Sequence, residues 1–131
     1  MREIADKIFE KEFTVEEKDI AANIKSGAMR VLATPVLVAW MEGTACDFLE
    51  SYLEGDESTV GTEVSIRHTA PTPVGSVVTV RLELKEVNGR EYAFYITARD
   101  EVGEIADCDH RRFVIYKEKF QKKADARTAG I

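Results

Sequence analysis

Residues 34–53 are apolar at nearly every position in their first half and become amphipathic in their second half. Thr34-Pro35 is typical of a helix start, because threonine is a good N-cap and proline is favoured in the first turn. Glu54-Gly55-Asp56 predicts the stop. A helix that is apolar nearly all round must be covered on most sides. We therefore expect a buried helix over residues 34–53, with Thr34 as its N-cap.

After residue 58 the pattern changes to an alternation with a period of two, which is typical of strands. The expected strands cover residues 59–68, 78–85, 92–98 and 105–116. Asn88-Gly89 is a strong hairpin signal between the second and third of them. Ahead of the helix, residues 12–16 alternate in the same way, and residues 19–25 predict one or two helical turns. The basic tail is expected to be loosely ordered over residues 121–131.

These elements predict a single α+β domain over residues 1–131. A curved antiparallel sheet wrapped around the helix would cover part of it, and a second copy of the chain would cover the rest. That architecture is the hotdog fold, which usually forms a homodimer. The alternative is another α+β roll in which a helix lies in a bent sheet.

Composition narrows the function classes. The net charge of -6 argues against a general nucleic-acid binder. No apolar stretch approaches the roughly 18 residues of a membrane span, and the charged N-terminus does not resemble a signal peptide. Cys46 and Cys108 show neither metal-ligand spacing nor a disulfide framework. We therefore expect a cytoplasmic protein with reduced thiols and no membrane or nucleic-acid partner.

Glu42 is the one acid in the apolar segment ATPVLVAWMEGTAC, residues 33–46. A lone ionised carboxylate in apolar surroundings costs several kcal/mol or more, so it must be paired, hydrogen-bonded or protonated. One interpretation is a structural acid held by an arginine or by backbone amides. The other is a carboxylate placed for acid–base or nucleophilic work.

Thr34 and His68 are the candidates to act with Glu42. The start of a buried helix offers free amide N–H groups that can stabilise an oxyanion, and a threonine hydroxyl there could bind or attack an acyl carbon. Thr34 and Glu42 are separated by roughly 12 Å of helix rise and about 80° of rotation, so direct contact is not expected. His68, at a strand end, could close that gap, or it could be a surface or packing histidine.

The last strand and the tail hold the remaining candidates. Arg111 or Arg112, next to His110, could neutralise a buried acid or bind an anion; alternatively the three form a solvent-facing polar strip. The tail lysines could meet nucleotide phosphates, or the tail is simply a charged surface; these are Lys117, Lys119, Lys122 and Lys123. No motif favours NAD, ATP or zinc, and we expect no metal and no cofactor.

Three segments together resemble the fluoroacetyl-CoA thioesterase family of hotdog proteins: ATPVLVAWMEGTAC, VGTEVSIRHTAPTPVG and HRRFVIYKEKF. The resemblance covers roughly residues 30–120. It implies hydrolysis of an acyl-CoA thioester, with coenzyme A entering only as part of the substrate. It also implies a catalytic set of Thr34, Glu42 and His68, an acyl pocket near Gly61, and a substrate-binding arginine at Arg112. Either Glu42 activates water or attacks directly, or Thr34 is the acylated nucleophile.

One difference from that family concerns the stretch before Thr34. The fluoroacetate-specific member carries phenylalanines there that act as a hydrophobic lid, whereas KSGAMRVL contains no aromatic residue. We therefore expect a small acyl group without selectivity for a fluorinated one. Two alternatives remain. The first is a hotdog protein that binds acyl-CoA or a small ligand without catalysis. The second is an enoyl-thioester hydratase, which usually has a histidine on the helix that this chain lacks.

Overall fold

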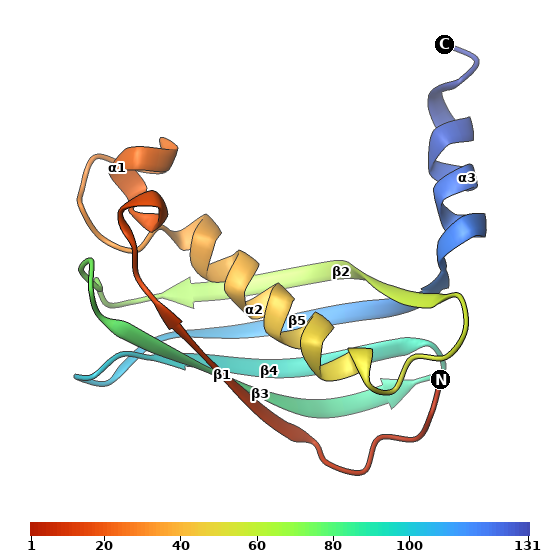
Figure 1. The fold of residues 1–131 in the computed structure, drawn as a ribbon, viewed down its shortest axis with the longest axis horizontal. Coiled ribbons are helices and arrows are strands. Elements are labelled where there is room, and N and C mark those ends of the chain that lie inside the picture. Colours follow the sequence, from red (N-terminus) through yellow and green to blue (C-terminus); the bar gives the residue numbers. More distant parts are fainter.

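A computed structural model describes all of residues 1–131 and shows one long helix lying across one face of a five-stranded antiparallel sheet (Figure 1). The strand order is β1-β3-β4-β5-β2, which leaves β1 and β2 at the edges. The elements along the chain are β1 (Ile8–Thr14), η1 (Glu17–Asp19), α1 (Ala21–Ile24), α2 (Thr34–Glu50), β2 (Glu57–His68), β3 (Val77–Asn88), β4 (Glu91–Arg99), β5 (Glu104–Tyr116) and α3 (Lys117–Thr128). The predicted α+β arrangement of a helix in an antiparallel sheet is confirmed.

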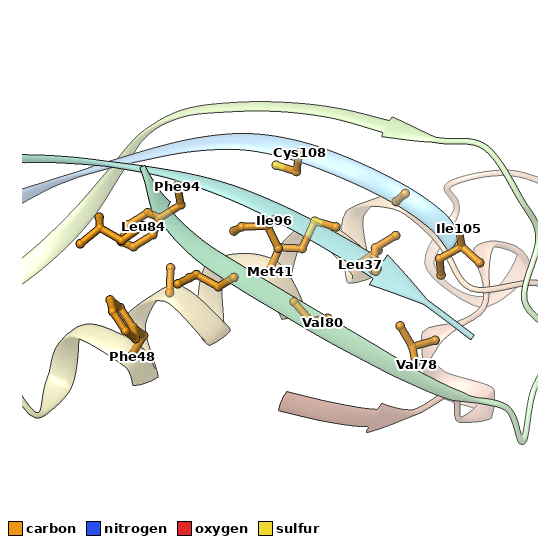
Figure 2. Close-up of a cluster of buried hydrophobic side chains, with 14 of the residues drawn as sticks. Leu37, Met41, Phe48, Val78, Val80, Leu84, Phe94, Ile96, Ile105 and Cys108 are labelled. Atoms are coloured by element: carbon orange, nitrogen blue, oxygen red, sulfur yellow. The ribbon is translucent and has the colours of Figure 1, made fainter. Parts of the chain in front are cut away.

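The core lies between α2 and the inner face of β3, β4 and β5 (Figure 2). Alternate residues of each strand point inward, as the two-residue period predicted, and Leu82 pairs directly with Ile96. Leu37 and Met41 of α2 lie against them and are almost completely buried. Burial of each such side chain contributes roughly 1.5–3 kcal/mol, so this layer fixes the position of α2 on the sheet.

The outer face of α2 is open in the single chain. Thr34, Pro35 and Ala39 are exposed, and Glu42 is half-buried. One sheet covers only one face of a helix, so a single chain covers part of α2, as predicted, and the cover expected from a second copy stays a prediction. None of the helices is both long and apolar enough to cross a membrane.

A β-bulge interrupts the pairing of β2 with β5 and has consequences for the site. Gly61 pairs with Arg112 and Glu63 with Arg111, so Thr62 is the extra residue. Beyond the bulge Val64 pairs with the buried His110, and His68 pairs with Ala106. Directly paired residues share a face of the sheet. Gly61 and His68, which strict alternation would put on opposite faces, therefore both lie on the face that carries α2.

The C-terminal segment differs from the loosely ordered tail that was predicted. Residues 117–128 form α3, which rises away from the sheet at the end of β5 (Figure 1). None of its side chains is buried. Contacts between residues four apart support it, namely the Glu118–Lys122 ion pair at 3.1 Å and the Gln121–Asp125 hydrogen bond at 2.9 Å. Such pairs and good helix formers stabilise a helix without any tertiary packing.

Candidate active site

Thr34 and His68 meet where the start of α2 lies beside the end of β2. The Thr34 Oγ1 and His68 Nδ1 atoms are 2.8 Å apart. The prediction that Thr34 is the N-cap is wrong: Ala33 holds that position with extended backbone angles, and Thr34 is the first helical residue. Its hydroxyl makes no capping bond and is engaged with the imidazole instead.

The other ring nitrogen of His68 is poised for a ligand. His68 Nε2 is buried and has no hydrogen-bond partner in the chain. Leaving a buried polar atom unpaired costs about 1–3 kcal/mol, so such an atom calls for an explanation. Burial lowers the pKa of His68, against a smaller opposing effect of the Ala70 backbone, and this keeps the ring neutral near neutral pH. Beside it is a cavity of about 360 Å³, lined by the segment that leads into α2 and by residues 68–71.

The first turn of α2 supplies free amide groups next to this pair. The Leu37 N–H bonds to the Ala33 carbonyl and the Ala33 N–H to the Asp19 carbonyl, while Pro35 has no N–H. The unengaged donors of the helix start are therefore those of Thr34 and Val36. Together with the hydroxyl they form a group of donors that can stabilise a negatively charged oxygen.

Glu42 lies further along α2, beside Arg112 of β5. Its Oε2 atom is 3.8 Å from Arg112 Nη1, and the exposed fractions of the two side chains are 41% and 6%. Arg112 also donates from Nε to Thr59 Oγ1 at 3.0 Å and from Nη2 to the Thr59 carbonyl at 3.1 Å. The structure pairs Arg112 with an acid, as one interpretation predicted, but Glu42 is half-buried and not the buried acid that was expected. Substrate binding by Arg112 stays a prediction. The solvent-facing polar strip is wrong for His110 and Arg112, which are both buried.

Gly61 leaves the space that Glu42 and Arg112 use. A Cβ atom at this position would lie 2.9 Å from Glu42 Oε2 and 3.3 Å from Arg112 Nη1. Real Cβ atoms essentially never come closer than 3.0 Å to another heavy atom, so any side chain here would shift the end of the Glu42 side chain. A glycine within a strand is a signal of such a close approach, and the sequence resemblance placed Gly61 near the pocket.

Within one chain, the predicted residues form two half-sites. Thr34 and His68 form one, and Glu42, Gly61 and Arg112 form the other, with no hydrogen bond or ion pair between them. Gly61 and His68 are six β5 positions apart in the register, which corresponds to about 20 Å. The structure brings the imidazole to the hydroxyl as predicted, and it pairs the acid with an arginine instead of with the imidazole.

Thr59 was not singled out from the sequence, although it binds Arg112 twice. Its position two residues before Gly61 on the same strand is the signal that could have found it, because such residues share a face. His110 was considered only as part of a polar strip, yet its Nε2 atom lies 3.2 Å from Arg112 Nη1.

Comparison with known proteins identifies the family of this chain. The model of the FlK family, described as fluoroacetyl-CoA-specific thioesterase, matches residues 15–118. A fluoroacetyl-CoA thioesterase from Streptantibioticus cattleyicolor is 41% identical over 98 residues, which are 75% of this chain and 70% of the relative.

Two solved structures extend the comparison to the fold. The crystal structure of a single-site mutant of the fluoroacetyl-CoA-specific thioesterase FlK superposes with a TM-score of 0.90 and 32% identity, covering 97% of this chain and 100% of that one. A hot-dog-like protein from Thermanaerovibrio acidaminovorans, 21% identical, has a TM-score of 0.87 over 95% of this chain and 92% of its own, and it supports the fold alone. The hotdog fold and the thioesterase class predicted from the sequence are thereby confirmed. The chain belongs to the fluoroacetyl-CoA-specific thioesterase family.

Proposed function

We propose that this protein hydrolyses a small-acyl coenzyme A thioester, using Thr34, Glu42 and His68 and no metal or redox cofactor. The observation that carries the proposal is the 2.8 Å contact between Thr34 Oγ1 and His68 Nδ1 at the start of α2. It puts a hydroxyl, a neutral imidazole with a free Nε2 and two unengaged amides at one place. Family membership supports the same reaction.

The chemistry of each group indicates its role in the reaction. The amides of Thr34 and Val36 bind the thioester oxygen as it gains negative charge, and in the first scheme the threonine hydroxyl joins them. Glu42, with the Arg112 cation beside it, removes a proton from water or attacks the acyl carbon itself. In the second scheme Thr34 attacks the acyl carbon while His68 accepts its proton, and water then hydrolyses the acyl-threonine ester. In every scheme coenzyme A leaves as a thiolate that takes up the transferred proton, and one water molecule is consumed to release the carboxylic acid, either directly or from the acyl-enzyme.

The protein acts as a homodimer in this proposal, and the two half-sites are the reason. Edge strand β2 is free to pair with β2 of a second copy. Antiparallel self-pairing matches positions that are equally far from the two-fold axis. An axis between Val64 and Ser65 would set Gly61 opposite His68 of the partner subunit. Glu42 of one chain would then complete the Thr34–His68 pair of the other, and each α2 would cover the open face of its counterpart.

Thiol release from a panel of short acyl-CoAs tests the activity. The wild-type protein is expected to release coenzyme A from small acyl thioesters. Glu42→Gln and His68→Ala are expected to lose at least about a hundredfold in kcat/KM, as removal of a positioned acid–base group does, while they keep the wild-type circular dichroism spectrum. Unchanged turnover in both variants would refute the assignment. A melting temperature raised by acyl-CoA that is not consumed would instead indicate the non-catalytic binding protein.

A further inference from the structure

His110 is a buried histidine that the reaction scheme above does not use. It lies on β5 with 1% of its surface exposed, and both of its ring nitrogens have partners. Nδ1 is 2.8 Å from the carbonyl oxygen of Glu63, and Nε2 is 3.2 Å from Arg112 Nη1. A carbonyl oxygen only accepts and a guanidinium only donates. Both contacts are therefore hydrogen bonds only in the neutral ring that carries its proton on Nδ1.

The bulge in β2 creates this arrangement. Glu63 is the first residue paired with β5 after the register shift at Gly61, and its carbonyl oxygen lies 2.8 Å from His110 Nδ1. Gly61 leaves the ring room, since a Cβ there would lie 3.3 Å from His110 Cε1. The same irregularity thus holds the imidazole and opens the space for Glu42.

The surroundings of the ring favour its neutral form. Burial lowers the pKa of His110 most, and the Arg112 cation lowers it further, against the opposing effects of the Glu63 carbonyl and the Glu42 carboxylate. Arg112 comes from β5 and Glu42 from α2, and the ring of Phe94 on β4 stacks at a centroid distance of 6.3 Å. Val64, the residue of β2 that pairs with His110, carries no charge.

We propose that His110 is a positioning residue for the hydrolysis: its Nε2 accepts from Arg112 and, with Thr59, holds the guanidinium so that Nη1 lies beside Glu42. Arg112 has no freedom to turn while these three contacts persist. Protonation of His110 would put an N–H and a positive charge against the Arg112 donor. The guanidinium would then move, and Glu42 would lose the cation that orients it. The inference rests on the proposed role of Glu42.

Nitrogen NMR of the imidazole rings tests the arrangement without any enzyme assay. The chain has only two histidines, so His68→Ala assigns the spectrum. His110 is expected to show the Nδ1–H tautomer and to titrate below the ordinary histidine midpoint of about 6.5. Arg112→Met is expected to raise that midpoint, because it removes the neighbouring cation. An Nε2–H tautomer, or a midpoint that does not respond to Arg112→Met, would overturn the proposal even if no acyl-CoA is hydrolysed.

A matched pair of amide substitutions tests the effect on catalysis. In His110→Gln the amide reaches the place of Nε2, so its oxygen can accept from Arg112. In His110→Asn the shorter amide reaches only the place of Nδ1. We expect His110→Asn to lose about tenfold in kcat with little change in KM, the size of one hydrogen bond to a charged group. His110→Gln is expected to keep most of kcat. Because glutamine does not titrate, kcat of this variant should also lack the part of its decrease at low pH that protonation of His110 causes.

The double variant shows whether His110 acts through Arg112. In an Arg112→Lys background, His110→Asn should cause no further loss, since the bond it breaks is already gone. Equal losses in the asparagine and glutamine variants, or additive losses in the double variant, would contradict a positioning role. If the wild-type protein shows no turnover at all, the proposed function is refuted. The NMR result would still show whether His110 Nε2 accepts a hydrogen bond from Arg112.

Discussion

The chemistry of single residues here depends on which groups are desolvated. Arg112 is buried, so its charge requires nearby acceptors, and Thr59, His110 and Glu42 supply them. Glu42 keeps 41% of its side chain exposed, so water or a substrate can reach it. The buried Arg112 cation therefore sets the position of the Glu42 carboxylate, and the exposed part of the Glu42 side chain stays accessible.

Gly61→Ala tests how closely that carboxylate must be held. The new Cβ would lie 2.9 Å from Glu42 Oε2 and would push it away. We expect kcat to fall at least about tenfold, because small displacements of a reacting group are costly. Gly103→Ala is the control, since nothing lies within 4 Å of a Cβ there. A Gly61→Ala variant with the kcat of the control would show that this close approach does not matter.

The two histidines make stability depend on pH. Burial lowers the pKa of both His68 and His110 in the folded state. Between those lowered values and about 6.5, the unfolded chain therefore binds more protons than the folded one. Stability is then complete above pH 6.5 and decreases as the pH falls below it. Urea unfolding at pH 7 and pH 5 should show a smaller decrease in the free energy of unfolding for His68→Gln/His110→Gln than for the wild type. An unchanged decrease would contradict these shifts.

At the scale of elements, periodicity predicted most of the fold, and a local irregularity limited the prediction of the site. The alternation in residues 78–98 and the Asn88-Gly89 turn predicted β3 and β4, and Gly89 has the positive φ of 63° that such a turn requires. The bulge at Thr62 leaves no periodic signal. Without the bulge, positions 61 and 68 would face opposite sides of the sheet. The sequence therefore singled out Gly61 and His68 as candidates but could not predict that both lie on the face that carries α2.

α3 shows that a helix can form here without a core to hold it. Because none of its side chains is buried, Ala124→Gly should reduce its helicity at a local cost of about 1 kcal/mol while global unfolding hardly changes. Ala45→Gly, in the buried face of α2, should lower the free energy of unfolding by at least about 1 kcal/mol. Circular dichroism and urea titration distinguish the two. Equal global destabilisation would mean that α3 is packed against something.

The whole molecule has three incomplete features, and one second copy would complete all of them. Strand β2 is an unpaired edge, the outer face of α2 is open, and Glu42 lies apart from the Thr34–His68 pair. The sequence predicted the dimer from the apolar helix. It could not show that the proposed catalytic residues are split between half-sites, because helix spacing places Glu42 relative to Thr34 but does not say which part of β2 each of them lies beside.

The most direct test of this account is complementation between two inactive variants. Glu42→Gln and His68→Ala chains are each expected to be inactive alone. Mixed in equal amounts and allowed to exchange subunits, half of the dimers should be mixed. In each mixed dimer one composite site holds an intact Glu42 and an intact His68 of the partner subunit, so about a quarter of wild-type activity should return. No recovery of activity, with mixed dimers demonstrated by mass spectrometry, would contradict a site shared between two chains.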